Sequence, residues 1–324
     1  MDLYALGVDL GGTTMKGGLV HPSHGLVHEE VVDTEAEEGA DRVLDRVAAL
    51  VASLQAAVPA GAGALGVGIG VPGVVALDRA TVIKPPNLPG WDRIHVPEAI
   101  RRRLDAPLPI VVENDANVAA LGSAFFGAGR SFDSFIMATL GTGVGGAIVH
   151  RHRLFRGASG AAGELGHMSV DYEGPLARSG IPGAVEAYIG QAFLSRHARF
   201  RLLNEDTQLK GPAGPELEAL TPRQLYEAAA AGDEPARAVL AWAGHKLGCA
   251  LGGAVCLLDI RKVVVGGGIS QAGDFVLEPT RRALHQFVLP SFREGLEVVR
   301  ETLGNEVALL GAACLVFEQA EDGA

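Results

Sequence analysis

The chain has 324 residues, of which 48% are hydrophobic and 5% aromatic, and its formal net charge is −11. This length is natural for two domains, and so acidic a protein is not expected to hold a nucleic-acid backbone, which attracts clustered lysine and arginine. No leader or membrane-helix pattern is recognised, and Cys249, Cys256 and Cys314 form no CxxC motif. We therefore expect a soluble cytoplasmic protein with three buried, reduced thiols.

Apolar β-type runs alternate with helical spacings along the chain. Strands are predicted at residues 4–8, 16–20, 26–32, 65–71, 109–113, 135–140, 145–149 and 262–265. Helices are predicted at residues 43–54, 116–126 and 306–318, and surface helices between 195 and 235. The unit of strand, glycine-threonine turn and strand occurs at 4–20 and again at 135–149. This repetition indicates two related α/β lobes, each opening with a hairpin.

Glycine is the compositional outlier, with 44 residues, about twice its usual share. Three clusters follow predicted strands: Gly11-Gly12, Gly141 to Gly146, and Gly266 to Gly268. Glycine lets backbone N–H groups approach a phosphate closely. Thr13, Thr14 and Thr142 add hydroxyl donors, and Asp9 could hold a metal-bound water. One such turn alone can be a mere tight turn, but the duplicated hairpins favour nucleotide binding.

Two segments match the dinucleotide-binding pattern GxGxxG, at residues 68–73 and 141–146. That pattern has meaning only where it opens a helix after a strand. The first segment contains Pro72 and leads into a loop, and the second runs into a strand-like Ala-Ile-Val. Neither context fits a Rossmann site, and no P-loop pattern is present.

The segment from Ile110 to Asn117 passes from a strand into a helix and places Asp115 at the helix start. The helix dipole favours an ionised carboxylate there, which suits a base that takes a proton from a hydroxyl during phosphoryl transfer. Position alone nevertheless favours an ordinary helix cap. A second polar group, Glu164, His167 and Glu186, lies beside glycines and could hydrogen-bond sugar hydroxyls.

In this order, the segments resemble the ROK family of bacterial sugar kinases and repressors, in particular its glucokinases. The resemblance covers nearly the whole chain. The segments that carry it are Asp9 to Val20, Gly70 to Gly73, Asn87 to Trp91, Glu113 to Asn117, Leu140 to Gly146, Gly163 to His167, and Gly183 to Glu186. Each motif alone is weak, but the ordered set is specific.

The resemblance implies two actin-like, ribonuclease H-like α/β lobes with a central cleft. We expect a small lobe at residues 1–118, with the C-terminal helix 306–324 returning to it, and a large lobe at 119–305. The implied activity is ATP-dependent phosphorylation of a hexose at its 6-hydroxyl, with glucose as the leading substrate. Fructose, mannose or an N-acetylated hexosamine are alternatives, and the family implies a homodimer or homotetramer.

The resemblance also implies roles for individual residues, with Asp115 as the general base. The expected sugar contacts are Gly73, Asn87, Asn114, Asp115, Glu164, His167 and Glu186. The expected contacts of ATP and Mg²⁺ are Asp9, Gly11, Gly12, Thr13, Thr14, Lys16, Gly141, Thr142, Gly143, Gly266 and Gly267. Asp9 would hold Mg²⁺ through water, and Lys16 can equally serve only to support the hairpin.

One departure concerns zinc. Many family members carry a site of one histidine and three cysteines in the pattern GxxCxCGxxGCxE. Here the three cysteine positions hold Ala177, Ser179 and Ala184, while His167 and Glu186 remain. A structural zinc site needs about four ligands, so we expect no structural zinc.

The resemblance also includes two non-enzymatic classes of protein. Repressors of the family carry a winged-helix domain before the first phosphate motif, which begins here at Asp9, so a repressor is not expected. A non-catalytic sugar sensor is disfavoured because the whole set of implied catalytic residues is present.

Overall fold

The computed structural model describes residues 2–106 and 108–322. By its internal contacts the chain divides into two compact units, each described by itself below. Unit 1 comprises Met1–Asp133, Ile148–Ala162 and Asn305–Ala324, and unit 2 comprises Ser134–Ala147 and Gly163–Gly304. Contacts thus group residues 119–133 and 148–162 with unit 1, where the helix that begins at Asp115 packs against the C-terminal helix.

Unit 1 contains a five-stranded sheet in the order β3-β2-β1-β4-β8. The strands are β1 (Leu3–Leu10), β2 (Thr14–His21), β3 (Gly25–Asp33), β4 (Gly63–Val71) and β8 (Ile110–Asn114). The first three form an antiparallel meander, and β4 and β8 continue parallel to β1. A small antiparallel sheet joins β5 (Val74–Val75), β6 (Thr81–Ile83) and β7 (Arg93–His95).

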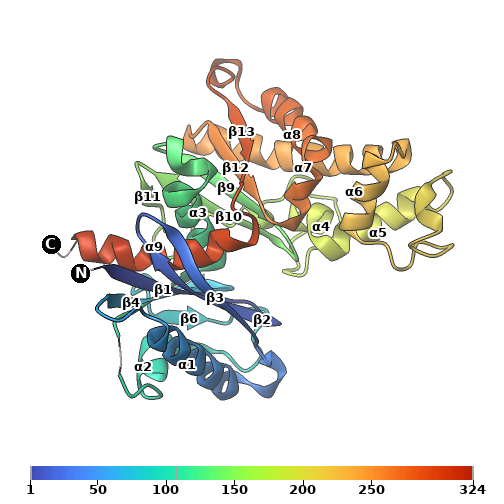
Figure 1. Ribbon diagram of the computed structural model, residues 1–324. Coiled ribbons are helices and arrows are strands. Elements are labelled where there is room, and N and C mark those ends of the chain that lie inside the picture. The colour runs from blue at the N-terminus through green and yellow to red at the C-terminus, as the bar shows by residue number, and fades with distance from the viewer. Residues whose placement is uncertain (1, 107, 323–324) are drawn as a thin grey trace. The chain divides into compact units, whose positions relative to one another are not determined.

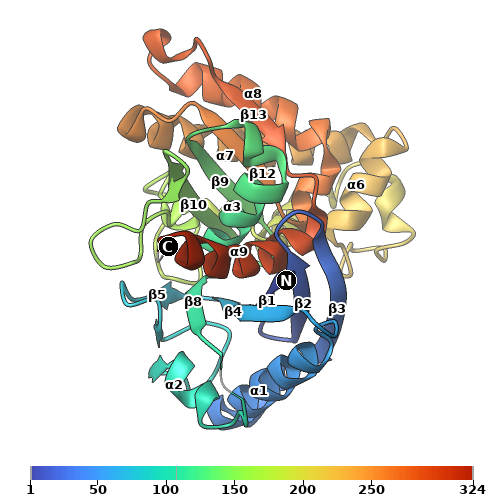
Figure 2. The same cartoon turned by 60° about the vertical axis from the view of Figure 1, so that its left-hand side comes forward.

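Helices cover both faces of this sheet (Figures 1 and 2). α1 (Ala40–Ala56) packs on β1 and β2, and the apolar residues that predicted it, from Val43 to Leu54, are buried. α9 (Val307–Asp322) packs on β1 and β4 from the other side, together with α3 (Asp115–Phe126). The short α2 (Val96–Arg101) lies beside α1.

A second five-stranded sheet repeats the same strand order. It runs β11-β10-β9-β12-β13, built from β9 (Phe135–Leu140), β10 (Val144–His150), β11 (Arg153–Leu154), β12 (Lys262–Gly266) and β13 (Glu297–Arg300). Its strands belong to unit 2 except for the end of β10 from Ile148 on and β11, whose contacts group them with unit 1. When the five strands of each sheet are numbered along the chain, both sheets have the spatial order 3-2-1-4-5. This common order confirms the predicted duplication. The α/β class is confirmed as well.

The helices of unit 2 include a long central pair, α7 (Glu234–Leu258) and α8 (Asp274–Phe287), which pack side by side. α4 (Glu186–Ile189), α5 (Gln191–Leu202) and α6 (Pro222–Ala230) lie around α7. By length and composition α7 could cross a membrane, but 61% of its most apolar window is buried inside the protein, as in the core helix of a soluble protein.

The thiols differ from the sequence expectation. Cys314 on α9 is buried, but Cys249 on α7 is only half-buried and Cys256 is exposed. The expectation of three buried thiols is therefore wrong for α7, because its last turns project one face toward solvent.

Glycines bring α9 into backbone contact with its neighbours. A Cβ on Gly311 would lie 1.6 Å from the Val118 carbonyl oxygen of α3, and one on Gly122 would lie 2.0 Å from the Val307 carbonyl oxygen. On the sheet, a Cβ on Gly68 would lie 1.7 Å from the Ala312 carbonyl oxygen. No side chain larger than hydrogen fits at these crossings, so they fix the position of α3 against α9.

We predict that Gly311→Ala lowers the free energy of unfolding by at least about 1–3 kcal/mol, because the methyl group has no space between the helices. Gly253→Ala is the matched control: this glycine is exposed on α7, and its added Cβ meets only the Met168 methyl at 3.5 Å. The control is expected to gain up to about 1 kcal/mol of helix propensity. Equal denaturant midpoints for the two variants would contradict the close backbone contact between α3 and α9 at Gly311.

Candidate active site

The first glycine turn joins β1 to β2 and is closed by its own backbone. The Gly11 N–H donates to the Thr14 carbonyl over 3.1 Å. Thr34 holds the turn from outside, donating its hydroxyl to the Gly11 carbonyl over 2.7 Å and its N–H to the Thr13 carbonyl over 2.8 Å. A Cβ on Gly12 would lie 3.0 Å from the Asn87 Cβ. The turn therefore lies against Asn87, one of the expected sugar contacts.

Asp9, the last residue but one of β1, pairs with Lys16 on β2. Burial raises the pKa of the Asp9 carboxyl from 3.8, against the lowering influence of the Lys16 ammonium. Lys16 itself pairs loosely with Glu29 across the next strand, at 3.9 Å. A partly buried carboxylate whose negative charge is balanced only in part by Lys16 is suited to face a cation. Lys16 itself is partly paired with Glu29.

The β8–α3 junction places Asp115 on the first turn of α3. The cap of this helix is Asn114, whose side-chain oxygen accepts from the N–H groups of Ala116 and Asn117. The interpretation of Asp115 as the cap is therefore wrong, although its Oδ1 also accepts from the Ala116 N–H over 2.8 Å. The Asn114 amide donates to the Gly73 carbonyl over 2.9 Å. Gly73, Asn114 and Asp115 thus lie together, with the Asp115 carboxylate exposed.

In unit 2 the second glycine turn is closed by the Gly141 N–H donating to the Gly143 carbonyl over 3.0 Å. The third turn lies directly beside it, since a Cβ on Gly267 would lie 2.4 Å from the Leu140 carbonyl oxygen. Glu186 also reaches this place: its Oε2 accepts from the Val144 N–H over 3.2 Å. The two expected phosphate turns of this unit and an expected sugar ligand are therefore neighbours.

Glu164 and His167 lie on a short 3₁₀ turn that packs against β10. The packing needs glycine, because a Cβ on Gly166 would lie 1.9 Å from the Val144 carbonyl oxygen. The Glu164 carboxylate and His167 Nε2 are 3.7 Å apart. His167 Nδ1 is buried with no hydrogen-bond partner among the described residues. This exposed acid and its neighbouring imidazole offer an acceptor and a donor to a polyhydroxylated ligand.

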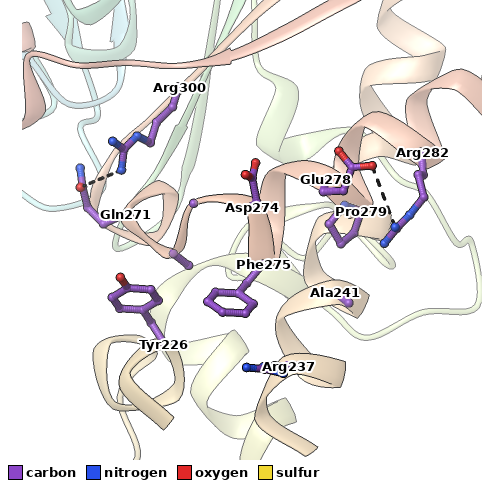
Figure 3. Close-up of a pocket in the computed structure, with 12 residues that line it drawn as sticks. Tyr226, Arg237, Ala241, Gln271, Asp274, Phe275, Glu278, Pro279, Arg282 and Arg300 are labelled. Carbon is purple, nitrogen blue, oxygen red and sulfur yellow. Dashed lines mark hydrogen bonds and ion pairs between the residues drawn. The ribbon is translucent and has the colours of Figure 1, made fainter. Parts of the chain in front are cut away.

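A hollow that the sequence did not reveal lies on unit 2 beyond the third glycine turn. It measures about 540 Å³ and is lined by residues of α6, α7, α8 and the segment 271–273. Tyr226 and Phe275 lie side by side there, with ring centroids 6.2 Å apart and ring planes tilted by 60°, and the Arg237 guanidinium lies 5.6 Å from the Phe275 ring centroid (Figure 3). Arg300 donates to the Gln271 amide oxygen over 3.4 Å at the other side.

Comparison with known proteins identifies the family. The ROK family profile matches residues 5–319. The chain belongs to the ROK family. It is 33% identical over 317 residues to a glucokinase of Thermotoga maritima, with 98% of each chain covered. It is 33% identical to a glucokinase of Streptomyces coelicolor, with 97% of each covered.

Solved structures of the ROK family show the same fold. A ROK glucokinase of Streptomyces griseus in complex with glucose and AMPPNP superposes with a TM-score of 0.84 at 33% identity, covering 97% of this chain and 99% of that one. A ROK hexokinase of Thermus thermophilus superposes with a TM-score of 0.78 at 30% identity, covering 98% and 99%. The expected fold of two actin-like α/β lobes is therefore confirmed.

The loop that carries zinc in many ROK proteins closes here on apolar contacts. Ala177 and Ala184, at two of the three cysteine positions, are buried in a cluster with Ala187 and Phe193. Gly183 fixes the loop, since a Cβ there would lie 1.6 Å from the Asp171 carbonyl oxygen. Among the residues that the structure describes, no group of three or more His, Cys, Asp or Glu is placed to hold a metal ion.

We predict that the purified protein contains less than stoichiometric zinc by mass spectrometry of metals. After dialysis against EDTA, added Mg²⁺ alone is expected to restore full activity, because the 167–186 loop needs no thiolate ligands. A ROK relative that keeps all three cysteines serves as the positive control for zinc removal. One zinc per chain, or recovery that depends on zinc, would overturn the expectation.

We predict that Asp9→Asn raises the Tm of the ligand-free protein at pH 7 and lowers activity. A carboxyl whose pKa is raised by folding destabilises the fold when it is ionised. Its contribution to the free energy of unfolding therefore falls as pH rises from about 4 through the folded pKa. The Tm difference between variant and parent should therefore shrink toward pH 4. Differential scanning fluorimetry across pH 4–8 measures it, and an unchanged or lower Tm at pH 7 would be the contrary result.

Proposed function

We propose that this protein transfers the γ-phosphoryl group of ATP to the 6-hydroxyl of glucose. The protein is a sugar kinase of hexose type, and the finer assignment to glucose rests on its likeness to glucokinases over nearly the whole chain. The single observation that carries most weight is the glucose- and AMPPNP-bound relative, which is 33% identical and shares the fold at a TM-score of 0.84. A cytoplasmic homodimer or homotetramer is our expectation for the assembly.

In this proposal Asp115 is the general base. Its place on the first turn of α3 lets the helix dipole stabilise the carboxylate, and the residue is exposed at the surface of unit 1. As the 6-oxygen of the sugar bonds to phosphorus, Asp115 takes the hydroxyl proton, and the bond from phosphorus to the bridging oxygen of ADP breaks. Such catalysis depends mainly on positioning and charge. Asn87, Asn114, Glu164, His167 and Glu186, with the Gly73 backbone, would hold the other hydroxyls.

The phosphates of ATP would contact the backbone N–H groups of the three glycine turns, which no Cβ obstructs. The contacts proposed for this group are Gly11, Gly12, Thr13, Thr14, Gly141, Thr142, Gly143, Gly266 and Gly267, with Lys16 at the edge of the hairpin. The partly buried Asp9 carboxylate fits a role in holding Mg²⁺ through water. When bound, Mg²⁺ would supply charge neutralisation for the phosphates.

We further assign the nucleoside base to the Tyr226–Phe275 hollow. The segment 271–273 that lines it begins three residues after Gly268, so a nucleotide with phosphates at that turn would extend toward the aromatic pair. Aromatic faces stack on a base without regard to its hydrogen-bonding edge.

We predict that Asp115→Asn lowers kcat by about 10²–10⁴, the usual contribution of a general base, while glucose binding persists. A coupled ATP-consumption assay measures turnover, and calorimetry measures glucose affinity. The same assay on a panel of glucose, mannose, fructose and N-acetylated hexosamines tests the choice of substrate. Full turnover in Asp115→Asn would exclude the base assignment, and preference for another sugar would exclude glucose.

We predict that Phe275→Ala raises the KM for ATP by about tenfold, since one base–aromatic contact contributes about 1–3 kcal/mol, and leaves the KM for glucose unchanged. Phe200→Ala is the matched control, because this phenylalanine is 84% exposed and does not line the hollow. Steady-state kinetics with either substrate varied measures both constants. An unchanged KM for ATP in Phe275→Ala would show that the nucleoside base binds elsewhere.

A further inference from the structure

A buried carboxylate lies immediately before the proposed base. Glu113 is the fourth residue of the apolar strand β8, and its side chain is fully buried. Its Oε1 accepts from the Asn114 N–H over 2.9 Å and from the Asn117 amide over 3.0 Å. Glu113 therefore binds the last residue of the strand and the first turn of α3 at once, on both sides of Asp115.

The other carboxylate oxygen faces two arginines. Glu113 Oε2 lies 2.6 Å from Arg156 Nε, at an angle outside hydrogen-bonding geometry, so the contact is an ion pair. Arg79 Nε lies 3.7 Å away. A carboxylate this deeply buried requires such partners, because an uncompensated charge in the protein interior is strongly destabilising.

Arg156 also links Glu113 to the chain that follows Gly73. Its guanidinium donates to the carbonyls of Val75, Ala76 and Leu77 over 3.3, 2.8 and 3.1 Å. Asn114 binds the Gly73 carbonyl at the start of the same segment. One arginine thus ties the segment 73–77 to the junction that carries Asp115.

Arg79 extends the network to the C-terminal helix. Its Nη1 lies 3.6 Å from the Glu318 carboxylate on α9, and its carbonyl accepts from the Val112 N–H on β8 over 2.8 Å. Its φ is +52°, a conformation that costs energy for a residue with a side chain. The surrounding contacts hold this strained residue where its guanidinium meets both carboxylates.

From these contacts we propose that Glu113 and Arg156 are positioning residues of the phosphoryl transfer: Glu113 Oε1 sets the β8–α3 junction that presents Asp115, and Arg156 holds Glu113 in place. The inference rests on the proposed function, with Asp115 as base. Misplacing a reacting group by about 1 Å can cost about 10²-fold in rate. Substitutions of the pair should therefore lower kcat. They should leave the affinity for ATP unchanged, because the proposed ATP contacts lie at the glycine turns and the Tyr226–Phe275 hollow.

Three variants separate positioning from mere stability. Arg156→Met leaves the Glu113 charge without its nearest partner and should lower both Tm and kcat, the latter at least tenfold. The double variant Glu113→Gln with Arg156→Met removes both charges but keeps an amide oxygen that can accept from Asn114 and Asn117. The double variant Glu113→Met with Arg156→Met removes both charges and the acceptor. Asp233→Asn, which weakens a buried cap of α7 in unit 2, is the stability control.

The expected result is that the Gln-containing double variant regains Tm and kcat relative to Arg156→Met. The Met-containing double variant should stay at least tenfold below it in kcat, with the KM for ATP unchanged. All assays run well below the lowest Tm of the set. The proposal is overturned if the two double variants have kcat values within twofold of each other. It is also overturned if Asp233→Asn loses as much kcat as Arg156→Met for the same loss of Tm. Absence of hexose turnover in the parent protein would instead reject the proposed function.

Discussion

The structure depends on a contact in which no side chain takes part. Where α3 crosses α9, Gly122 and Gly311 let backbone meet backbone, and Gly68 lets α9 rest directly on the sheet. A helix held this closely cannot slide or rotate along its partner, because protein interiors are close-packed and respond to shifts of a methylene. The start of α3 is fixed as a result, and with it the place of Asp115. Glycines outside the three proposed phosphate turns thus determine where the proposed base stands.

Much of this could be predicted from sequence, for a physical reason. Strand, turn and helix signals are local, so the hairpin at Asp9 to Lys16 and the β8–α3 passage were recognisable from their own residues. The duplication was visible because both hairpins carry the same glycine-threonine turn, and the common strand order of the two sheets bears it out. The ROK resemblance added the order of motifs, which no single motif supplies.

The remainder depends on contacts between segments far apart in the chain. A glutamate inside the apolar run of β8 was the one signal of the buried ion pair, but nothing local points to Arg156 as its partner. Tyr226 and Phe275 come from different helices and have ordinary surroundings in sequence. Position alone favoured Asp115 over Asn114 as the cap of α3, although neighbouring Asn and Asp are equally good caps, so local sequence does not distinguish them. The exposure of Cys256 was missed because α7 is apolar on nearly all sides.

The alanine-lined loop before Glu186 has a chemical consequence. Thiolate ligands of zinc are nucleophilic sulfurs, and peroxide converts such sulfurs to sulfenic acid and higher oxides. A loop closed by Ala177, Ala184, Ala187 and Phe193 offers oxidants no zinc-bound thiolate. Hydrophobic contacts of this kind weaken on cooling, so the packing of this loop depends on temperature where a zinc site would depend on the oxidation state of its cysteines.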